Sequence, residues 1–230
     1  MISTLNLKFS GFAQEAIRLV FPPPADQWWG LFYYFSTLGI IIGAVVITFL
    51  VTAAVKYRYK PGKPEPEDAP KPGTFPRDRG HLKYLFALSF VTLSIISTLV
   101  VGSFSAFHVL TTPPDKGLAI EVTGFQWAWG FKYPNGVETV SNLVVPVNQT
   151  IVFHVTSRDV KHKFGVPYFK TASDAIPGQM GEIWIKPTST GSYDIRCYEL
   201  CGVGHAGMVG TITVVSQDQF SKWLENATKK

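Results

Sequence analysis

The sequence predicts a membrane α plus all-β protein, in which a hairpin of two transmembrane helices precedes a β-sandwich or β-barrel domain. Two long uncharged stretches in the first half predict the helices, and a series of short β-rich segments after Thr111 predicts the second part. Hydrophobic residues make up 46% of the 230 residues and charged residues only 16%. A soluble globular domain has about a quarter charged residues, so the composition favours a membrane-anchored chain.

The net charge of +5 is concentrated in one loop. Residues 56–83 contain eight Lys or Arg and four Asp or Glu, whereas residues 111–230 contain eleven and ten. A nucleic-acid-binding surface requires basic residues clustered on a folded face, and the long C-terminal part has no such cluster. We therefore expect no nucleic-acid partner.

Residues 28–110 are predicted to form the transmembrane hairpin. The first span, 29–55, and the second, 84–110, contain no Asp, Glu, Lys or Arg, and each exceeds the roughly 20 residues that cross a bilayer core. Three prolines at 22–24 would end any earlier helix and direct the chain into the first span. Two buried core helices of a soluble domain are the alternative, but a chain this short has too little other sequence to cover them.

The loop between the spans sets the predicted orientation. Residues 56–83 are rich in Pro and Lys, and short loops with excess Lys and Arg stay on the cytoplasmic side. Residues 1–27 are then an outer segment, expected to be amphipathic and without an obvious cleaved signal peptide. The same orientation predicts that residues 111–230 form an exported domain.

Residues 111–230 contain seven β-rich segments separated by turns with Pro, Gly, Asn or Asp. The segments are LAIEVTG, FQWAWGFKY, NLVVPV, TIVFHVTS, EIWIKP, SYDIRC and MVGTITVV. This number of strands predicts a sandwich or barrel. Ser216 is the expected N-cap of a final helix, because Phe220, Trp223 and Leu224 after it fall on one helical face.

The second of these segments is unusually aromatic. Five rings alternate along it, at Phe125, Trp127, Trp129, Phe131 and Tyr133. On a single strand they would all lie on one face of the sheet. Packing in the domain core is the ordinary explanation for most of them.

The segment CYELCGVGHAGM carries the chemistry of the chain. It places Cys197, Cys201, His205 and Met208 within twelve residues. Thiolate, imidazole and thioether ligands together select copper, and a weak axial Met is a feature of electron-transfer copper sites. The glycines between these residues disfavour a helix and permit a tight loop around a common centre.

A second Cys indicates a binuclear centre, because another thiolate can bridge two metals. Such a centre needs further ligands, and His162 and His154 are the candidates. His162 is favoured because it follows a strand in a polar segment at the predicted sheet edge, whereas His154 alternates with strand neighbours and can occupy an ordinary sheet face. A local disulfide between the cysteines and a zinc site of two Cys and two His are the alternatives. The zinc site leaves Met208 unexplained.

This arrangement resembles the copper-A domain of cytochrome c oxidase subunit II of the haem-copper oxidases. FQWAWGFKYPNG, TASDAIPGQM and the order of two spans before a β domain resemble the same family, and the likeness extends from about Trp28 to Val215. It implies that residues 111–230 form a copper-binding cupredoxin-like domain with a C-terminal helix. It also implies bridging thiolates from Cys197 and Cys201, terminal imidazoles from His162 and His205, and an axial Met208.

Two further residues receive roles from the resemblance. Glu199 would give its backbone carbonyl to one copper, and its side chain would bind a magnesium ion at the interface with subunit I. Trp127 matches the aromatic residue through which electrons enter. The implied partners are subunit I, subunit III, the lipid bilayer and a donor that is a cytochrome c or blue-copper protein.

The implied function is electron transfer from the donor through a binuclear copper-A centre to haem in subunit I, where oxygen reduction and proton translocation take place. Lys132 and Arg158 stand where many family members have acids. They indicate a less basic donor and favour a prokaryotic plasma membrane. The acidic residue that the family places near the second span has no clear counterpart in the segment from Arg77 to His81.

Other functions share parts of this pattern. A quinol-oxidase subunit II would have the fold but lack the metal ligands. A copper-delivery factor would not need the aromatic segment. A nitrous oxide reductase would carry a similar copper loop on a much larger catalytic chain. The alternatives are a copper-A subunit of another electron-transfer complex and a structural subunit of the quinol-oxidase type.

Overall fold

The computed structural model describes residues 17, 21–58, 60–62, 73 and 82–229. Most of the predicted outer segment and of the predicted cytoplasmic loop lies outside the described residues. So do Arg77, Asp78, Arg79 and His81. The predictions made for these parts of the chain remain predictions.

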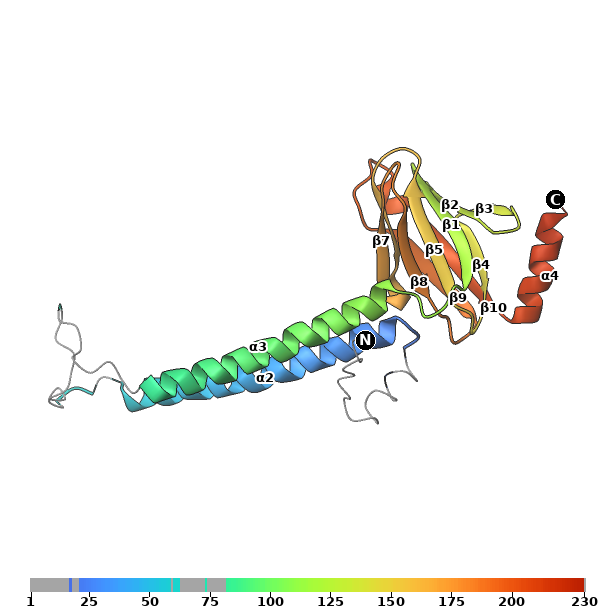
Figure 1. Cartoon of the computed structure of the whole chain (residues 1–230). Coiled ribbons are helices and arrows are strands. Elements are labelled where there is room, and N and C mark those ends of the chain that lie inside the picture. The colour runs from blue at the N-terminus through green and yellow to red at the C-terminus, as the bar shows by residue number, and fades with distance from the viewer. Residues whose placement is uncertain (1–16, 18–20, 59, 63–72, 74–81, 230) are drawn as a thin grey trace. The chain divides into compact units, whose positions relative to one another are not determined.

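Two long helices, α2 (Ala25–Lys56) and α3 (Leu82–Thr111), cover the predicted spans (Figure 1). α2 begins directly after the three prolines, since proline is tolerated before a helix and in its first turn but not in its interior. Both helices are long and apolar enough to cross a membrane. Their large apolar side chains are mostly exposed, with Ile40 at 72% and Phe104 at 73%. This exposure argues against two buried core helices and favours anchoring in lipid.

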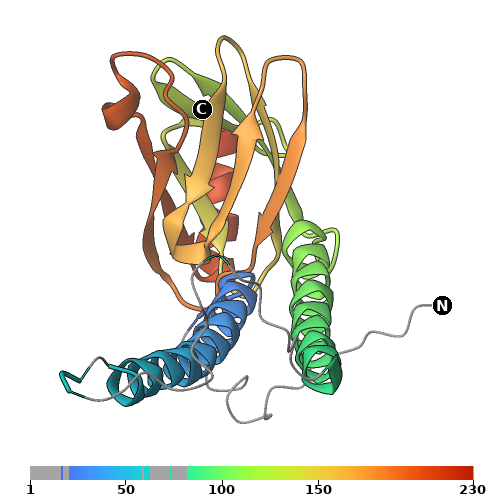
Figure 2. The ribbon, with the colours of Figure 1, turned by 90° about the vertical axis from the view of Figure 1, so that its left-hand side faces the viewer.

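The rest of the described chain forms a β-sandwich of two five-stranded sheets (Figure 2). The first sheet has the order β3-β2-β1-β5-β8 and the second has the order β4-β10-β9-β6-β7. The strands of the first sheet are β1 (Leu118–Phe125), β2 (Ala128–Lys132), β3 (Glu138–Val140), β5 (Ile151–Ser157) and β8 (Gly181–Ile185). The strands of the second are β4 (Asn142–Pro146), β6 (His162–Val166), β7 (Thr171–Ala175), β9 (Gly191–Cys197) and β10 (Val209–Val215). Two apolar helices followed by a β-sandwich confirm the predicted fold class.

The core lies between the two sheets and is centred on Phe164 of β6. The Phe164 ring centroid lies 5.1 Å from that of Trp129 and 5.4 Å from that of Phe153, both edge to face. All three side chains are fully buried, and edge-to-face aromatic pairs add to the free energy of burial. This aromatic contact joins β6 of one sheet to β2 and β5 of the other, and it fixes the start of β6.

The structure has three strands that the sequence did not predict. β3 is only three residues long, and β6 and β7 have the sequences HKFGV and TASDA. β3 is too short to give a strand pattern, whereas β6 and β7 contain Lys, Gly, Ser or Asp, which depress β-propensity. The pairing of β6 with β7 and β9 overrides the weak local preference of these two strands, and β3 pairs with β2.

The prediction of one continuous aromatic strand was wrong. Phe125 ends β1 and pairs with Ala128 of β2, so Gln126 and Trp127 form a two-residue turn between the two strands. The turn contains no Gly, Pro, Asn or Asp, which are the residues that normally mark a hairpin. Trp127 is therefore separated from the core rings that follow it.

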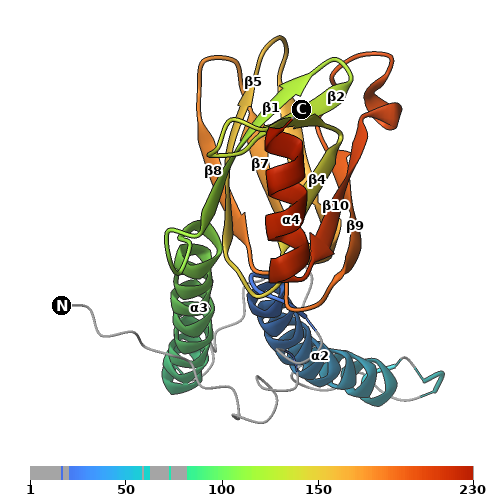
Figure 3. The same ribbon diagram turned by 90° about the vertical axis from the view of Figure 1, so that its right-hand side faces the viewer.

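The C-terminal helix α4 (Gln217–Thr228) lies along one side of the sandwich (Figure 3). Ser216 caps it as predicted, because its side chain accepts a hydrogen bond from the Gln219 amide and the Gln219 side chain reciprocates. Phe220 is buried, and Trp223 packs on Tyr133 with 5.1 Å between ring centroids. The predicted apolar face of this helix is confirmed.

Tyr133 joins the end of β2 to the edge strand β4. Its hydroxyl donates to the Val144 carbonyl at 2.8 Å and accepts from the Val144 amide at 2.9 Å. Burial of the ring raises the pKa of Tyr133 far above its usual value, although the hydrogen bond with Val144 opposes this shift. The hydroxyl therefore stays protonated and satisfies both backbone groups of one residue.

Replacing Tyr133 with Phe should leave both Val144 groups without a partner. Unsatisfied buried polar groups cost about 1–3 kcal/mol, and we expect a loss of that size in the free energy of unfolding, measured by denaturant titration of tryptophan fluorescence. Tyr193→Phe is the control, because its hydroxyl bonds to exposed Ser189 and to the Tyr168 hydroxyl rather than to both backbone groups of a strand residue. Equal effects of the two substitutions would contradict the assigned role of Tyr133.

Candidate metal centre

One loop between β9 and β10 brings most of the predicted ligands together. Cys197 is the last residue of β9, and Met208 directly precedes β10. The Cys197 amide donates to the Met208 carbonyl at 3.2 Å and closes the loop. A 3-10 turn, η2 (His205–Gly207), reverses the chain inside it. The loop contains no α-helix, as its glycines predicted.

His162 reaches the same centre from β6. Phe164 of this strand pairs with Cys197, so the start of β6 lies beside the end of β9. The prediction that His162 lies in a polar segment at a sheet edge was wrong, because β6 runs between β7 and β9 and His162 is 0% exposed. Its Nδ1 lies 4.0 Å from Cys197 Sγ.

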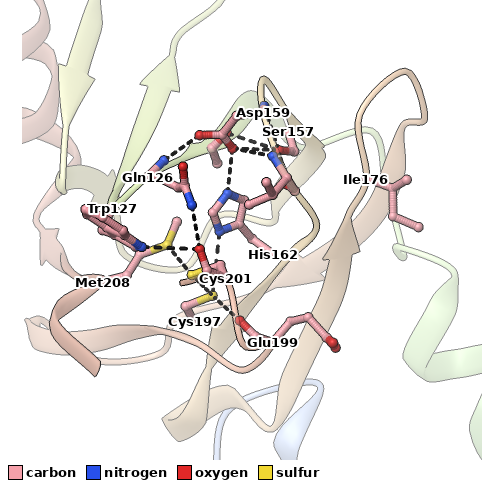
Figure 4. A network of polar contacts seen from close by, with 12 residues as sticks. Gln126, Trp127, Ser157, Asp159, His162, Ile176, Cys197, Glu199, Cys201 and Met208 are labelled. Carbon is pink, nitrogen blue, oxygen red and sulfur yellow. Dashed lines mark hydrogen bonds and ion pairs between the residues drawn. The ribbon is translucent and has the colours of Figure 1, made fainter. Parts of the chain in front are cut away.

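The donor atoms converge on a small buried volume (Figure 4). The two Sγ atoms of Cys197 and Cys201 lie 3.9 Å apart. Cys201 Sγ lies 3.6 Å from His205 Nδ1 and 3.7 Å from Met208 Sδ. The Glu199 carbonyl oxygen lies 3.3 Å from Cys197 Sγ. Five predicted ligand side chains and one predicted backbone ligand thus share one site.

The chemistry of this donor set fits a copper-A-type site. Both cysteines are free and buried, so the local disulfide is not formed. The donor atoms of His162, Cys197 and Cys201 all lie within 4.8 Å of one another. A tetrahedral zinc would be satisfied by four ligands and would leave buried Met208 without a role, whereas thiolate, imidazole and thioether together suit copper.

The proximity of the two thiols disfavours the thiolate form of Cys201 when no cation is bound. Burial, and next the neighbouring Cys197, raise the pKa of the Cys201 thiol from 9.0 to about 11. Only the thiolate is a strong metal ligand. A bound metal ion must therefore displace a tightly held proton, and its positive charge offsets the repulsion between the sulfurs.

Asp159 holds His162 from the side opposite the thiols. Its Oδ1 lies 2.8 Å from His162 Nε2. Partial desolvation of Asp159 opposes ionisation, but the hydrogen bonds from His162 and from the Gln126 and Val160 amides outweigh it and lower the pKa of Asp159 to about 2. The carboxylate accepts the Nε2 proton and leaves Nδ1 directed at Cys197. Sequence reasoning gave Asp159 no role, although its place three residues before a candidate ligand was a usable signal.

Trp127 connects the metal loop to the surface. Its indole Nε1 and the Gln126 side chain donate to the Cys201 carbonyl at 3.3 and 2.8 Å. A Cβ added to Gly204 would lie 2.3 Å from an indole carbon of Trp127, so this ring packs directly on the loop backbone. Trp127 is nevertheless 40% exposed.

Glu199 points away from the buried donors. Its Oε2 lies 3.7 Å from Lys161 Nζ, which also lies 3.2 Å from Asp174 Oδ2. Among the described residues, Glu199 belongs to no cluster of metal-binding side chains. His154 contacts a different partner, because its Nδ1 lies 3.6 Å from Glu182 Oε2.

Gly204→Ala should displace Trp127, because the backbone and the indole cannot separate without breaking the hydrogen bonds to the Cys201 carbonyl. We expect altered tryptophan fluorescence and weaker copper retention against a chelator. Gly207→Ala is the matched control in the same loop, because its added Cβ would meet nothing within 4 Å. If Gly204→Ala behaved like Gly207→Ala, the contact would have no structural importance.

The metal-free protein should show the raised pKa of Cys201 as slow alkylation. A pKa of about 11 makes the reactive thiolate about a hundredfold scarcer at pH 8 than a pKa of 9 would. The alkylation rate of Cys201, followed by peptide mass spectrometry, should therefore keep rising through pH 10. Cys197→Ser should speed the reaction because it removes the neighbouring charge. A rate that levels off by pH 10 would contradict this assignment.

Comparisons with known proteins agree with the geometry. A model of the family described as cytochrome C oxidase subunit II, periplasmic domain, matches residues 135–215. The chain is 40% identical over 211 residues to the heme-copper oxidase subunit 2 of Aeropyrum pernix, covering 86% of this chain and 88% of that protein. It is 28% identical over 241 residues to a probable cytochrome c oxidase subunit 2 of Rickettsia prowazekii, covering 93% and 74%.

The fold has a solved counterpart. The periplasmic domain of subunit II of cytochrome oxidase from Bradyrhizobium japonicum superposes with a TM-score of 0.50 and 38% identity, over 51% of this chain and 98% of that one. This match confirms the cupredoxin-like architecture expected for the β domain. From the extent of the Aeropyrum match and the copper-A-type donor set, we conclude that the chain belongs to the subunit II family of the haem-copper oxidases.

Proposed function

We propose that this chain receives electrons for a terminal haem-copper oxidase and passes them to haem in subunit I, where oxygen is reduced. The observation that carries the proposal is the meeting of two free, buried thiols with two imidazoles and a thioether in one loop and one adjoining strand. Such a set has the composition of an electron-transfer copper site.

The proposed ligands divide into two kinds. Cys197 and Cys201 would hold two copper ions jointly through their thiolates, and the ions would supply a one-electron carrier. His162, His205 and Met208 would be the further side-chain ligands, and the Glu199 carbonyl would complete the set. The 3.9 Å between the two sulfurs supports joint binding. The loop closure and the Asp159 contact hold the ligands in place, which limits rearrangement on a change of charge.

Trp127 is the proposed point at which electrons arrive. Its ring is partly exposed to a docking protein, and its indole nitrogen is one hydrogen bond from the backbone of Cys201. No bond is made or broken in this chain during the transfer.

The remaining parts of the proposal concern the assembly. α2 and α3 anchor the chain in a prokaryotic plasma membrane, with the copper domain on the outer side. Their small residues, such as Gly39 and Gly43, allow close packing against subunit I, and subunit III is a further expected partner. Proton translocation belongs to the partner subunits. A magnesium ion at Glu199 would require ligands from subunit I and release of the Lys161 contact.

The intact donor set argues against a purely structural subunit of the quinol-oxidase type. A copper-A subunit in another electron-transfer complex is the alternative that shares the site. The match over most of the length of an oxidase subunit favours the oxidase.

Trp127→Ala should slow reduction of the centre by a donor protein without changing the later transfer to haem, because only the first step uses the exposed ring. Rapid mixing of the native oxidase with reduced donor, followed at the copper and haem absorption bands, separates the two steps. Trp127→Phe is the control that keeps a ring at this position. An unchanged first step in Trp127→Ala, with normal copper content, would rule out this path.

A further inference from the structure

The surface beside the metal loop is apolar around Trp127. A Cβ added to Gly202 or Gly204 would lie within 3.3 Å of the indole ring, and Val203 between them is 97% exposed. An isolated Val this exposed needs no explanation, but one adjoining a 40% exposed Trp over a metal loop forms a contact surface. We call Trp127 and Val203 the apolar centre.

A cation borders this apolar centre. The Arg158 amide donates to the Gly124 carbonyl at 3.0 Å, and its guanidinium lies 4.6 Å from the centroid of the Phe125 ring. Phe125 directly precedes the turn that carries Trp127. Cation–π contact and a backbone hydrogen bond therefore hold Arg158 next to the turn. Within the described residues, no carboxylate forms an ion pair with it.

Asp159, which follows Arg158 in the sequence, directs its carboxylate at other partners. Asp159 accepts the Gln126 amide on Oδ2 at 2.7 Å, and its Oδ1 contacts His162 Nε2 at 2.8 Å and the Val160 amide at 2.7 Å. Both oxygens therefore face donors of this chain, and neither forms an ion pair with the Arg158 guanidinium.

The second candidate cation, Lys132, differs from Arg158. It lies opposite Glu121 of β1 and Glu138 of β3 in the strand register. Cross-strand acids on both sides balance its charge. Among the described residues, Arg158 is therefore the cation that borders the apolar centre without a facing acid in the strand register.

We propose that the electron donor of this subunit is a small redox protein with an acidic rim, which covers Trp127 and Val203 with an apolar patch and places a carboxylate on Arg158. The proposal rests on the proposed function of Trp127. An apolar centre with a charged rim is the usual anatomy of a transient interface. Complementary charge at the rim mainly increases the rate of association and makes it depend on salt.

The test compares two forms of one donor that carry opposite surface charge. A strongly basic c-type cytochrome and the same protein with its lysines succinylated to carboxylates are each reacted with the native oxidase complex. At low ionic strength, kcat/KM should be higher for the succinylated form and should fall as salt is added. A higher value for the basic form that falls with salt would overturn the proposal.

Arg158→Glu should reverse this preference. Loss of attraction and gain of repulsion should lower kcat/KM for the acidic donor by about tenfold at low salt and raise it for the basic donor. Lys222→Glu is the matched control, because it changes the net charge equally on α4, which packs on Tyr133 at the end of β2 away from the turn. If both variants had the same effect, Arg158 would have no local role and the proposal would fail.

Trp127→Ala separates this proposal from the one on which it rests. Slower reduction by both cytochromes, with the charge preference kept, supports both the electron path and the acidic donor. Unchanged rates in Trp127→Ala together with a reversed preference in Arg158→Glu would reject the path and retain the docking surface. Unchanged rates in both variants would reject both.

Discussion

Two buried sulfurs 3.9 Å apart are the constraint on which the rest of this domain depends. Both cysteines are largely buried, at 8% and 4% exposed, and their ionised forms repel each other. An arrangement that is unfavourable without a cation becomes favourable when metal ions lie between the sulfurs, so metal binding and the local fold are coupled. The hydrogen bond from the Cys197 amide to the Met208 carbonyl closes the loop and holds the two cysteines in the same region of the structure.

Both sheets contribute to holding this centre. β6 and β9 of one sheet supply His162 and Cys197, while the β1–β2 turn of the other sheet supplies Gln126 and Trp127, which both donate to the Cys201 carbonyl. Asp159 links the two groups, because its carboxylate contacts the Gln126 amide and the His162 ring. The same residues that orient the ligands thereby also join the sheets at this end of the sandwich.

The sequence predicted the fold class and the ligand-bearing loop because both are local signals. Uncharged runs of membrane length and a twelve-residue set of soft donors are visible without tertiary information. The parts that were missed depend on contacts between distant segments. β6 is a poor strand by composition and forms because Phe164 packs between the sheets. The turn at Gln126 lacks turn residues, and its reversal is visible only in the strand register. The ion pair of Glu199 with Lys161 likewise follows from the fold.

The central claim is that Cys197 and Cys201 hold two copper ions jointly. Electron paramagnetic resonance of the oxidised native oxidase tests it most directly, because hyperfine coupling counts the nuclei that share the unpaired electron. The account predicts the pattern of one electron divided equally between two copper nuclei. The pattern of a single copper nucleus, or no copper signal from this subunit together with a zinc ion bound at the site, would contradict it.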